Sequence, residues 1–171
     1  MKRMIALIAL SLTFAVLGLP AQIQPYPSEA KAAYTRVKGF LLAAADKMPE
    51  ENYGFRATPE VRPFGQLIAH VADSQWRICG TVRGEQKQGD AASKTSKADL
   101  VAALKASFEY CDSAYDSLND ATSSQKVPLF QRDFSKLSVL FLNTSHDNEM
   151  YGTISVYLRL KGLVPPSSEK H

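Results

Sequence analysis

The stretch from residue 137 to residue 163, LSVLFLNTSHDNEMYGTISVYLRLKGL, limits the possible folds more than any other part of the chain. Its apolar residues recur at intervals of three and four, which is the spacing of one face of an α-helix. We expect one helix from about Asp133 to Lys161, roughly 40 Å long, that Gly162 ends. Such a helix needs other helices to cover its apolar face.

The rest of the chain supplies those helices. Three earlier segments show the same periodicity, at residues 29–47, 62–83 and 96–118. Polar connections at residues 85–95 and 119–132 separate them, and no segment has the alternation of a strand. The pattern predicts an all-α fold, a four-helix bundle in a single domain over residues 27–168. The 85–95 connection, rich in Lys, Gln, Gly, Asp and Ser, is expected to be exposed and mobile.

Residues with known helix-end preferences mark the expected boundaries. Ser28 is placed to cap the first helix, and Ser96 to cap the third, with Asp99 three residues later. Pro63 fits the first turn of the second helix, where its missing N–H has little effect. Gly84 ends that helix.

The N-terminus has the layout of a secretory signal peptide. Lys2 and Arg3 precede an apolar run from Met4 to Leu19, and the small residue Ala21 follows. A run of this length is short for a membrane span. We therefore predict a signal peptide at residues 1–21 and a periplasmic or secreted protein with no stable membrane span after cleavage. An uncleaved N-terminal anchor is the alternative.

Composition argues against a nucleic-acid partner. The chain has 20 basic and 17 acidic side chains, and its net charge of +3 falls to +1 once the two basic residues of the signal peptide are removed. No block of Lys or Arg remains that would neutralise a row of phosphates, and no aromatic residues are interleaved with such a block for base stacking.

The two cysteines, Cys79 and Cys111, both fall in predicted helices. In an exported protein they can form a disulfide, which would stabilise the fold by about 3 to 4 kcal/mol through the loop that it closes. Two buried free thiols are the alternative.

The candidate site rests on two histidines in predicted helices. His70 lies in QLIAHVADSQW and His146 in NTSHDNEMYG, whereas His171 is the last residue and a poor ligand candidate. Met150 follows His146 by four residues and therefore shares its helix face. Histidines are also common in helices without any ligand role. The sequence contains no Gly-rich phosphate loop, no G-x-S-x-G and no H-E-x-x-H motif.

The segments FRATPEVRPFGQLIAHVADSQW and SHDNEMYGTISVYLRLKGLVPPSS together resemble the DinB superfamily, the YfiT-like four-helix bundles, over about residues 27–168. The resemblance implies zinc or nickel held by three histidines, one in the second helix and two spaced H-x-x-x-H in the fourth. His70 and His146 match two of these positions. Met150 stands at the third.

Three interpretations of a methionine at position 150, where the resemblance implies histidine, are open. In the first, the metal site is degenerate and Met150 packs in the core. In the second, Glu149 or Asp73, each three residues from a histidine, completes a site of two histidines and one carboxylate. In the third, His70, His146 and Met150 bind copper, which accepts a thioether better than zinc does.

The functional hypotheses follow from this site. The leading one is an exported DinB-like protein that binds a divalent metal at a degenerate His-His-Met site and whose biological role is unassigned. One alternative is an enzyme, a metal-dependent hydrolase or a thiol transferase of the bacillithiol or mycothiol type. Another is a non-catalytic binding or stress-associated module without metal. The sequence leaves open whether the protein is an enzyme. The resemblance also implies a homodimer.

Overall fold

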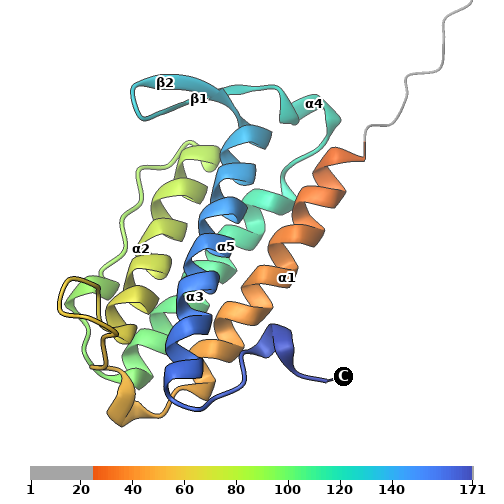
Figure 1. Ribbon diagram of the computed structural model, residues 1–171. Coiled ribbons are helices and arrows are strands. Elements are labelled where there is room, and N and C mark those ends of the chain that lie inside the picture. Colours follow the sequence, from red (N-terminus) through yellow and green to blue (C-terminus); the bar gives the residue numbers. More distant parts are fainter. Residues whose placement is uncertain (1–24, 171) are drawn as a thin grey trace, which may run out of the picture.

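Four long helices pack side by side in the computed structural model, which describes residues 25–170 (Figure 1). They are α1 (Tyr26–Lys47), α2 (Phe64–Arg83), α3 (Lys97–Asp116) and α5 (Lys136–Leu160). The predicted all-α four-helix bundle is therefore confirmed. The predicted signal peptide at residues 1–21 lies outside the described residues. Within residues 25–170, no helix combines the length and apolar character needed to cross a membrane.

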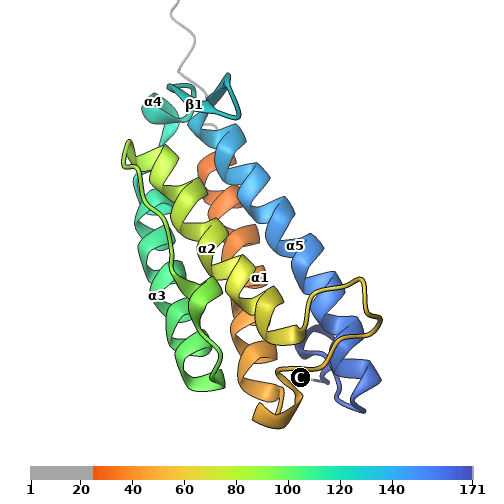
Figure 2. The same ribbon diagram turned by 90° about the vertical axis from the view of Figure 1, so that its left-hand side faces the viewer.

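The helices do not simply alternate in direction. Figures 1 and 2 show that α1 and α5 run one way and that α2 and α3 both run the other way. The connection between α2 and α3 must therefore return along the length of the bundle, and it does so beside α2. The remaining elements are short: η1 (Glu50–Asn52), η2 (Ala91–Ser93), α4 (Asp120–Ser123), β1 (Lys126–Leu129), β2 (Arg132–Ser135) and η3 (Pro166–Ser168).

Aromatic and aliphatic side chains from all four long helices fill the core. Tyr34 of α1 stacks on Tyr115 of α3 with ring centroids 3.9 Å apart, and Phe64 of α2 and Phe108 of α3 are fully buried beside other apolar residues. Burying each such side chain stabilises the fold by about 1.5 to 3 kcal/mol. The helix α2 is buried over most of its surface, so a residue on its one open face is held on a rigid support.

Most helix ends follow the sequence signals. The Ser96 hydroxyl accepts a hydrogen bond from the Asp99 amide at the start of α3, and Gly84 adopts φ 73° where α2 ends. The prediction for Ser28 is wrong, because α1 begins at Tyr26 with Pro25 as its cap. The Ser28 hydroxyl instead donates to the Pro25 carbonyl at 2.7 Å from inside the first turn.

The connection at residues 85–95 is mostly exposed, as expected, but it is anchored to α2 where mobility was expected. The carboxylate of Asp73 on α2 accepts hydrogen bonds from the Ala91 and Ala92 amides at 2.9 and 3.0 Å, and Ala91 is buried. A Cβ atom at Gly89 would collide with Asp73, so only glycine lets the connection approach α2 this closely. The connection is anchored along its path.

The second polar connection contains a hairpin that the sequence analysis missed. Strands β1 and β2 pair antiparallel, with Leu129 opposite Arg132, so that Phe130 and Gln131 form a two-residue turn. Both turn residues have positive φ, 50° and 61°. Val127 and Leu129 are buried while their strand neighbours are exposed. Two buried positions are too few to give a recognisable alternation.

Because of the hairpin, the last helix begins later in the chain than predicted. α5 begins at Lys136, where the Ser135 side chain accepts a hydrogen bond from the Ser138 amide, and not at Asp133, which belongs to β2. Gly162 follows the helix with φ 72°, as expected of a glycine that ends it.

A disulfide joins α2 to α3 inside the bundle, near the C-terminal ends of both helices. Cys79 and Cys111 are bonded, with Cα atoms 5.3 Å apart, and both residues are fully buried. No free cysteine remains among the described residues. The bond ties together the two parallel helices that the long connection links.

Candidate functional site

The structure brings the two candidate histidines together. His70 lies on α2 and His146 on α5, and their Nε2 atoms are 3.1 Å apart. The rings meet edge to face, at 66°, with centroids 5.1 Å apart. Both residues are half-buried, at the edge of the core.

A buried polar network beside the histidines sets the register of α2 against α5. The Gln75 amide nitrogen donates to Asp147 Oδ1 at 2.5 Å, and the Asn143 amide nitrogen donates to Gln75 Oε1 at 2.9 Å and to Asp147 Oδ2 at 3.3 Å. All three side chains are fully buried. Because unpaired buried polar groups are costly, this network favours a single alignment of the two helices.

The electrostatics of the site keep His70 neutral. Burial lowers the pKa of His70, and the neighbouring His146, Arg62 and Arg77 lower it further, against a smaller opposing effect of Asp73. At neutral pH its imidazole is therefore uncharged and has a lone pair available for a metal ion or a proton.

The Nδ1 atom of the His146 ring lacks a hydrogen-bond partner. His146 Nδ1 is buried and has no hydrogen bond, and the nearest carboxylate oxygen, Asp147 Oδ1, is 3.9 Å away, beyond hydrogen-bond distance. Burial raises the pKa of Asp147 above its ordinary value, although hydrogen bonding to Gln75 and the nearby His146 act against that shift. The carboxyl thus lies behind the ring without touching it.

The candidates for a third ligand lie in different surroundings. Met150 is partly buried and packs against the hydrophobic core, as the degenerate-site interpretation expects. Glu149 is exposed. Both carboxylate oxygens of Asp73 already accept amide hydrogen bonds from the α2–α3 connection. His171 lies outside the described residues. Within residues 25–170, no group of three His, Cys, Asp or Glu residues is arranged to hold a metal ion.

The distance between the two imidazoles is compatible with two ligands of one metal ion, and also with a direct hydrogen bond between the Nε2 atoms. Two nitrogens at zinc–nitrogen distances of about 2.0 to 2.1 Å lie about 3.1 Å apart when the bonds form an angle near 100°. The Nε2–Nε2 distance of 3.1 Å agrees with such a pair. The residues present therefore fit two positions of a divalent ion and leave the others without a protein ligand of the usual kinds.

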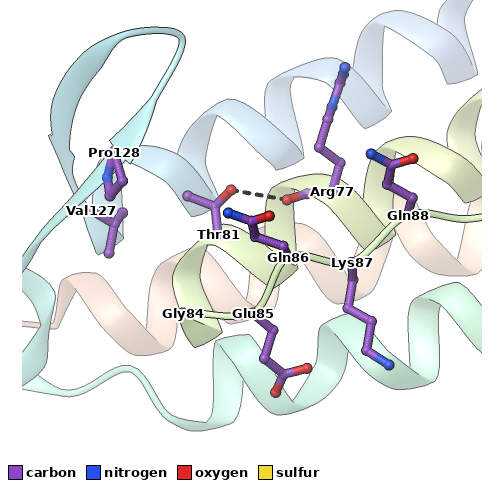
Figure 3. Close-up of a pocket in the computed structure, with 9 residues that line it drawn as sticks. All are labelled: Arg77, Thr81, Gly84, Glu85, Gln86, Lys87, Gln88, Val127 and Pro128. Atoms are coloured by element: carbon purple, nitrogen blue, oxygen red, sulfur yellow. Dashed lines mark hydrogen bonds between the residues drawn. The ribbon is translucent and has the colours of Figure 1, made fainter.

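A small cavity of about 340 Å³ opens beside His70. It is lined by His70, Asp73, Ser74, Arg77, Gln88 and Gly89. A second cavity of about 430 Å³, which shares Arg77 and Gln88 with the first, lies along α2 toward β1, and Figure 3 shows the residues around it. Residues of the anchored α2–α3 connection form one wall of both cavities. The anchoring therefore helps to fix the shape of these cavities.

Comparison with known proteins agrees with the fold. A sequence profile of the DinB superfamily matches residues 14–154. The chain belongs to the DinB superfamily. The family recognised from the sequence is thus confirmed, and no curated protein matches the chain.

Three solved structures resemble this DinB-superfamily chain in fold. A DinB-like protein from Bacillus cereus has a TM-score of 0.70 and 16% identity, with 81% of this chain and 95% of that chain covered. A DinB-like protein from Bacillus subtilis has a TM-score of 0.68 and 17% identity, with coverage of 84% and 99%. A mycothiol-dependent maleylpyruvate isomerase has a TM-score of 0.61 and 17% identity, with coverage of 78% and 66%.

Sequence reasoning missed the polar network and the guanidinium of Arg77. Asn143 and Asp147 are four residues apart on an otherwise apolar helix face, and Gln75 lies in the apolar stripe of α2. Polar residues at such core positions are a recognisable signal, because they are buried only when hydrogen-bonded. Arg77 follows His70 by seven residues and therefore lies on the same face of α2.

Proposed function

We propose that this protein is an exported member of the DinB superfamily that binds one divalent transition-metal ion, zinc or nickel, through the Nε2 atoms of His70 and His146. The observation that carries the proposal is the 3.1 Å distance between these atoms, which suits two ligands of one ion. The lowered pKa of His70 supports it, since only a neutral imidazole binds metal. The arrangement of the signal-like N-terminus supports export.

A metal ion at this site would have coordination positions that no protein side chain fills. A metal ion bound there would act as a Lewis acid and lower the pKa of a bound water or thiol. The cavity beside the site is lined by His70, Ser74 and Arg77 among others.

Elemental analysis of untagged protein tests this proposal. We expect close to one zinc or nickel ion per chain after loading and removal of excess metal, and loss of that metal in His70→Ala and in His146→Ala. His171→Ala is the matched control and should retain it, because His171 is not one of the two proposed ligands. A wild-type protein that retains no metal, or a His70→Ala variant that retains all of it, would overturn the proposal and favour a metal-free binding module.

A thiol-dependent transferase is the second candidate. It is supported by the similarity to the mycothiol-dependent maleylpyruvate isomerase and by a ligand set that leaves positions for a thiol sulfur. Cobalt-loaded protein treated with N-acetylcysteine should then develop a thiolate-to-metal absorption band in the near ultraviolet. A spectrum unchanged by the thiol would remove this candidate and leave metal binding itself untouched.

A further inference from the structure

The cavity of about 340 Å³ beside His70 has one charge of each sign on its wall. Arg77 and Asp73 both line it, and they are four residues apart on α2, which is about 6 Å along the helix axis. Residues at this spacing can form an ion pair. Among residues 25–170, however, no ion pair joins Asp73 to Arg77. Each charge therefore faces the cavity without the other as its counter-ion.

The Arg77 guanidinium is the cation of this cavity. Arg77 is exposed, and no carboxylate pairs with it in the part of the chain that the structure describes, whereas Arg83 on the same helix pairs with Glu85 at 2.8 Å. Figure 3 shows the side chains of Arg77 and Gln88 on the same side of α2 and that of Lys87 on the opposite side. A guanidinium is always charged and can bind a carboxylate through two parallel hydrogen bonds.

The Asp73 carboxylate supplies the negative charge. Its two oxygens accept hydrogen bonds from the Ala91 and Ala92 amides at 2.9 and 3.0 Å, one amide to each oxygen. An ionised carboxylate has about four lone-pair sites, so further acceptor positions remain. Asp73 is only partly buried, and it lines the cavity. An ammonium group can therefore bind to Asp73 while the α2–α3 connection stays anchored.

Ser74 is a polar side chain without a partner in the same wall. It is only 3% exposed and lines the cavity. Hydroxyls in helices often donate to the carbonyl four residues earlier, as Thr81 does to Arg77 at 3.0 Å. Within residues 25–170, the Ser74 hydroxyl makes no hydrogen bond. Because an unpaired buried hydroxyl is unfavourable, this group points to a ligand that supplies its partner.

We infer that this cavity binds a small α-amino acid as its zwitterion, with the carboxylate on Arg77, the ammonium on Asp73 and the Ser74 hydroxyl bonded to one of these two groups. A ligand with only a negative charge would be repelled by Asp73, and one with only a positive charge would be repelled by Arg77. A molecule that carries both charges is therefore favoured. No metal ion takes part in these contacts, so the site does not depend on the metal binding proposed above.

The size and the walls of the cavity limit the ligand. The two charged residues are one helical turn apart, which suits the closely spaced ammonium and carboxylate of an α-amino acid better than a long chain with a charge at each end. A volume of about 340 Å³ is at the lower end of the range for small-molecule sites. The rest of the described wall, His70, Gln88 and Gly89, offers no aliphatic side chain to the ligand. Glycine, alanine and serine fit these limits, whereas leucine does not.

NMR titration of the metal-free, isotope-labelled full chain tests the inference. Propionate is alanine without its ammonium group, and ethylamine is alanine without its carboxylate. Alanine should bind at least about tenfold tighter than either, because each compound lacks one charge-assisted contact. Leucine should bind more weakly than alanine. The largest shifts on adding alanine should occur at the amides of residues 73–77 and 88–92.

Two variants assign the charges. Arg77→Gln should lower the affinity for alanine about tenfold, to that of ethylamine, without lowering the affinity for ethylamine. Asp73→Asn should likewise weaken alanine binding without weakening propionate binding. Arg36→Gln, which removes the same charge from the exposed surface of α1, is the control and should bind alanine as the wild type does. A general disturbance of the fold would not produce these selective losses.

Several results would overturn the inference. They are propionate or ethylamine binding as tightly as alanine, an Arg77→Gln variant with wild-type affinity for alanine, and a wild-type protein that binds none of glycine, alanine and serine. Because Arg77 is exposed, Arg77→Gln should unfold at the wild-type temperature, and it decides the question even if Asp73→Asn is too unstable to use. The protein in this experiment is free of metal, so none of these results bears on the metal binding that elemental analysis tests.

Discussion

The Nε2 atoms of His70 and His146 lie 3.1 Å apart although 76 positions separate the two residues in the chain. Met150 is one turn beyond His146 on α5, at the position where the family pattern has a third histidine. We expect Met150→His to raise the affinity for zinc by a factor of ten or more, because imidazole is a better zinc ligand than thioether. Competition with a chromophoric chelator measures this affinity.

Met150→Leu is the control for that substitution. It preserves the apolar contacts of Met150 with the core and should leave zinc binding unchanged. A Met150→Leu variant that loses metal as completely as His70→Ala would show instead that the thioether is a ligand, and the copper interpretation would then be preferred.

Protonation of His70 should make stability depend on pH. Its pKa in the folded protein is below the ordinary value of 6.5, so between those two values the unfolded chain binds more protons than the folded one. The free energy of unfolding should therefore rise with pH through this window, reach its full value above about 6.5 and fall on acidification.

Urea unfolding between about pH 5 and 8 in the presence of a chelator measures this effect. The difference between wild type and His70→Gln should grow as the pH rises through the window. Asp147, whose pKa is raised by burial, acts in the opposite direction above 3.8, but it is present in both proteins and cancels in the comparison. A pH-independent difference would contradict the assignment to His70.

Asp73 is expected to have a structural role. Asp73→Asn should weaken the two hydrogen bonds to the Ala91 and Ala92 amides and lower stability by about 1 to 3 kcal/mol. Hydrogen exchange at these two amides should accelerate more than exchange elsewhere. Metal content should stay at the wild-type level; a loss of metal would support the alternative in which Asp73 is a ligand.

The disulfide should contribute to stability through the chain loop that it closes. The double variant Cys79→Ala, Cys111→Ala should lose about 3 to 4 kcal/mol of unfolding free energy. Intact mass should rise by about two hydrogens on reduction. Reduced wild-type protein should resemble the double variant in its denaturation curve. Two thiols that label freely in denatured, unreduced protein would refute the bond.

The hairpin turn carries a removable strain. Phe130 and Gln131 both have positive φ, which bulky residues adopt at a free-energy cost. Replacing them by Asn and Gly, the preferred pair for such a two-residue turn, should stabilise the protein by about 1 kcal/mol or more in chemical denaturation. Phe130→Ala alone retains a non-glycine residue at positive φ and should bring no comparable gain.

The long helices were predictable because each buries a periodic apolar stripe and most ends carry a local signal, such as Ser96 or Gly84. The hairpin was not, since only Val127 and Leu129 of β1 are buried. The path of the α2–α3 connection depends on long-range hydrogen bonds to Asp73, which no local pattern encodes.

The candidate site was likewise predictable only in part. Helix spacing and the family resemblance identified His70 and His146, but their distance depends on how two helices are aligned. The surroundings of Met150, Glu149 and Asp73 also depend on packing between elements that are far apart in the chain. Sequence periodicity gives the helix face on which a residue lies. It gives no information about how far one helix is shifted along its axis relative to another.

The alignment of α5 along α2 is controlled from inside the bundle, by the hydrogen bonds among Gln75, Asn143 and Asp147. A slip of α5 past α2 by a single turn, about 5.4 Å, would break all of these bonds and draw the two imidazoles out of reach of a common ion. Gln75, Asn143 and Asp147 are not among the proposed metal ligands, yet their hydrogen bonds set the distance between the two imidazoles. A substitution at Gln75 or Asn143 should therefore change that distance even though both histidines stay in the sequence.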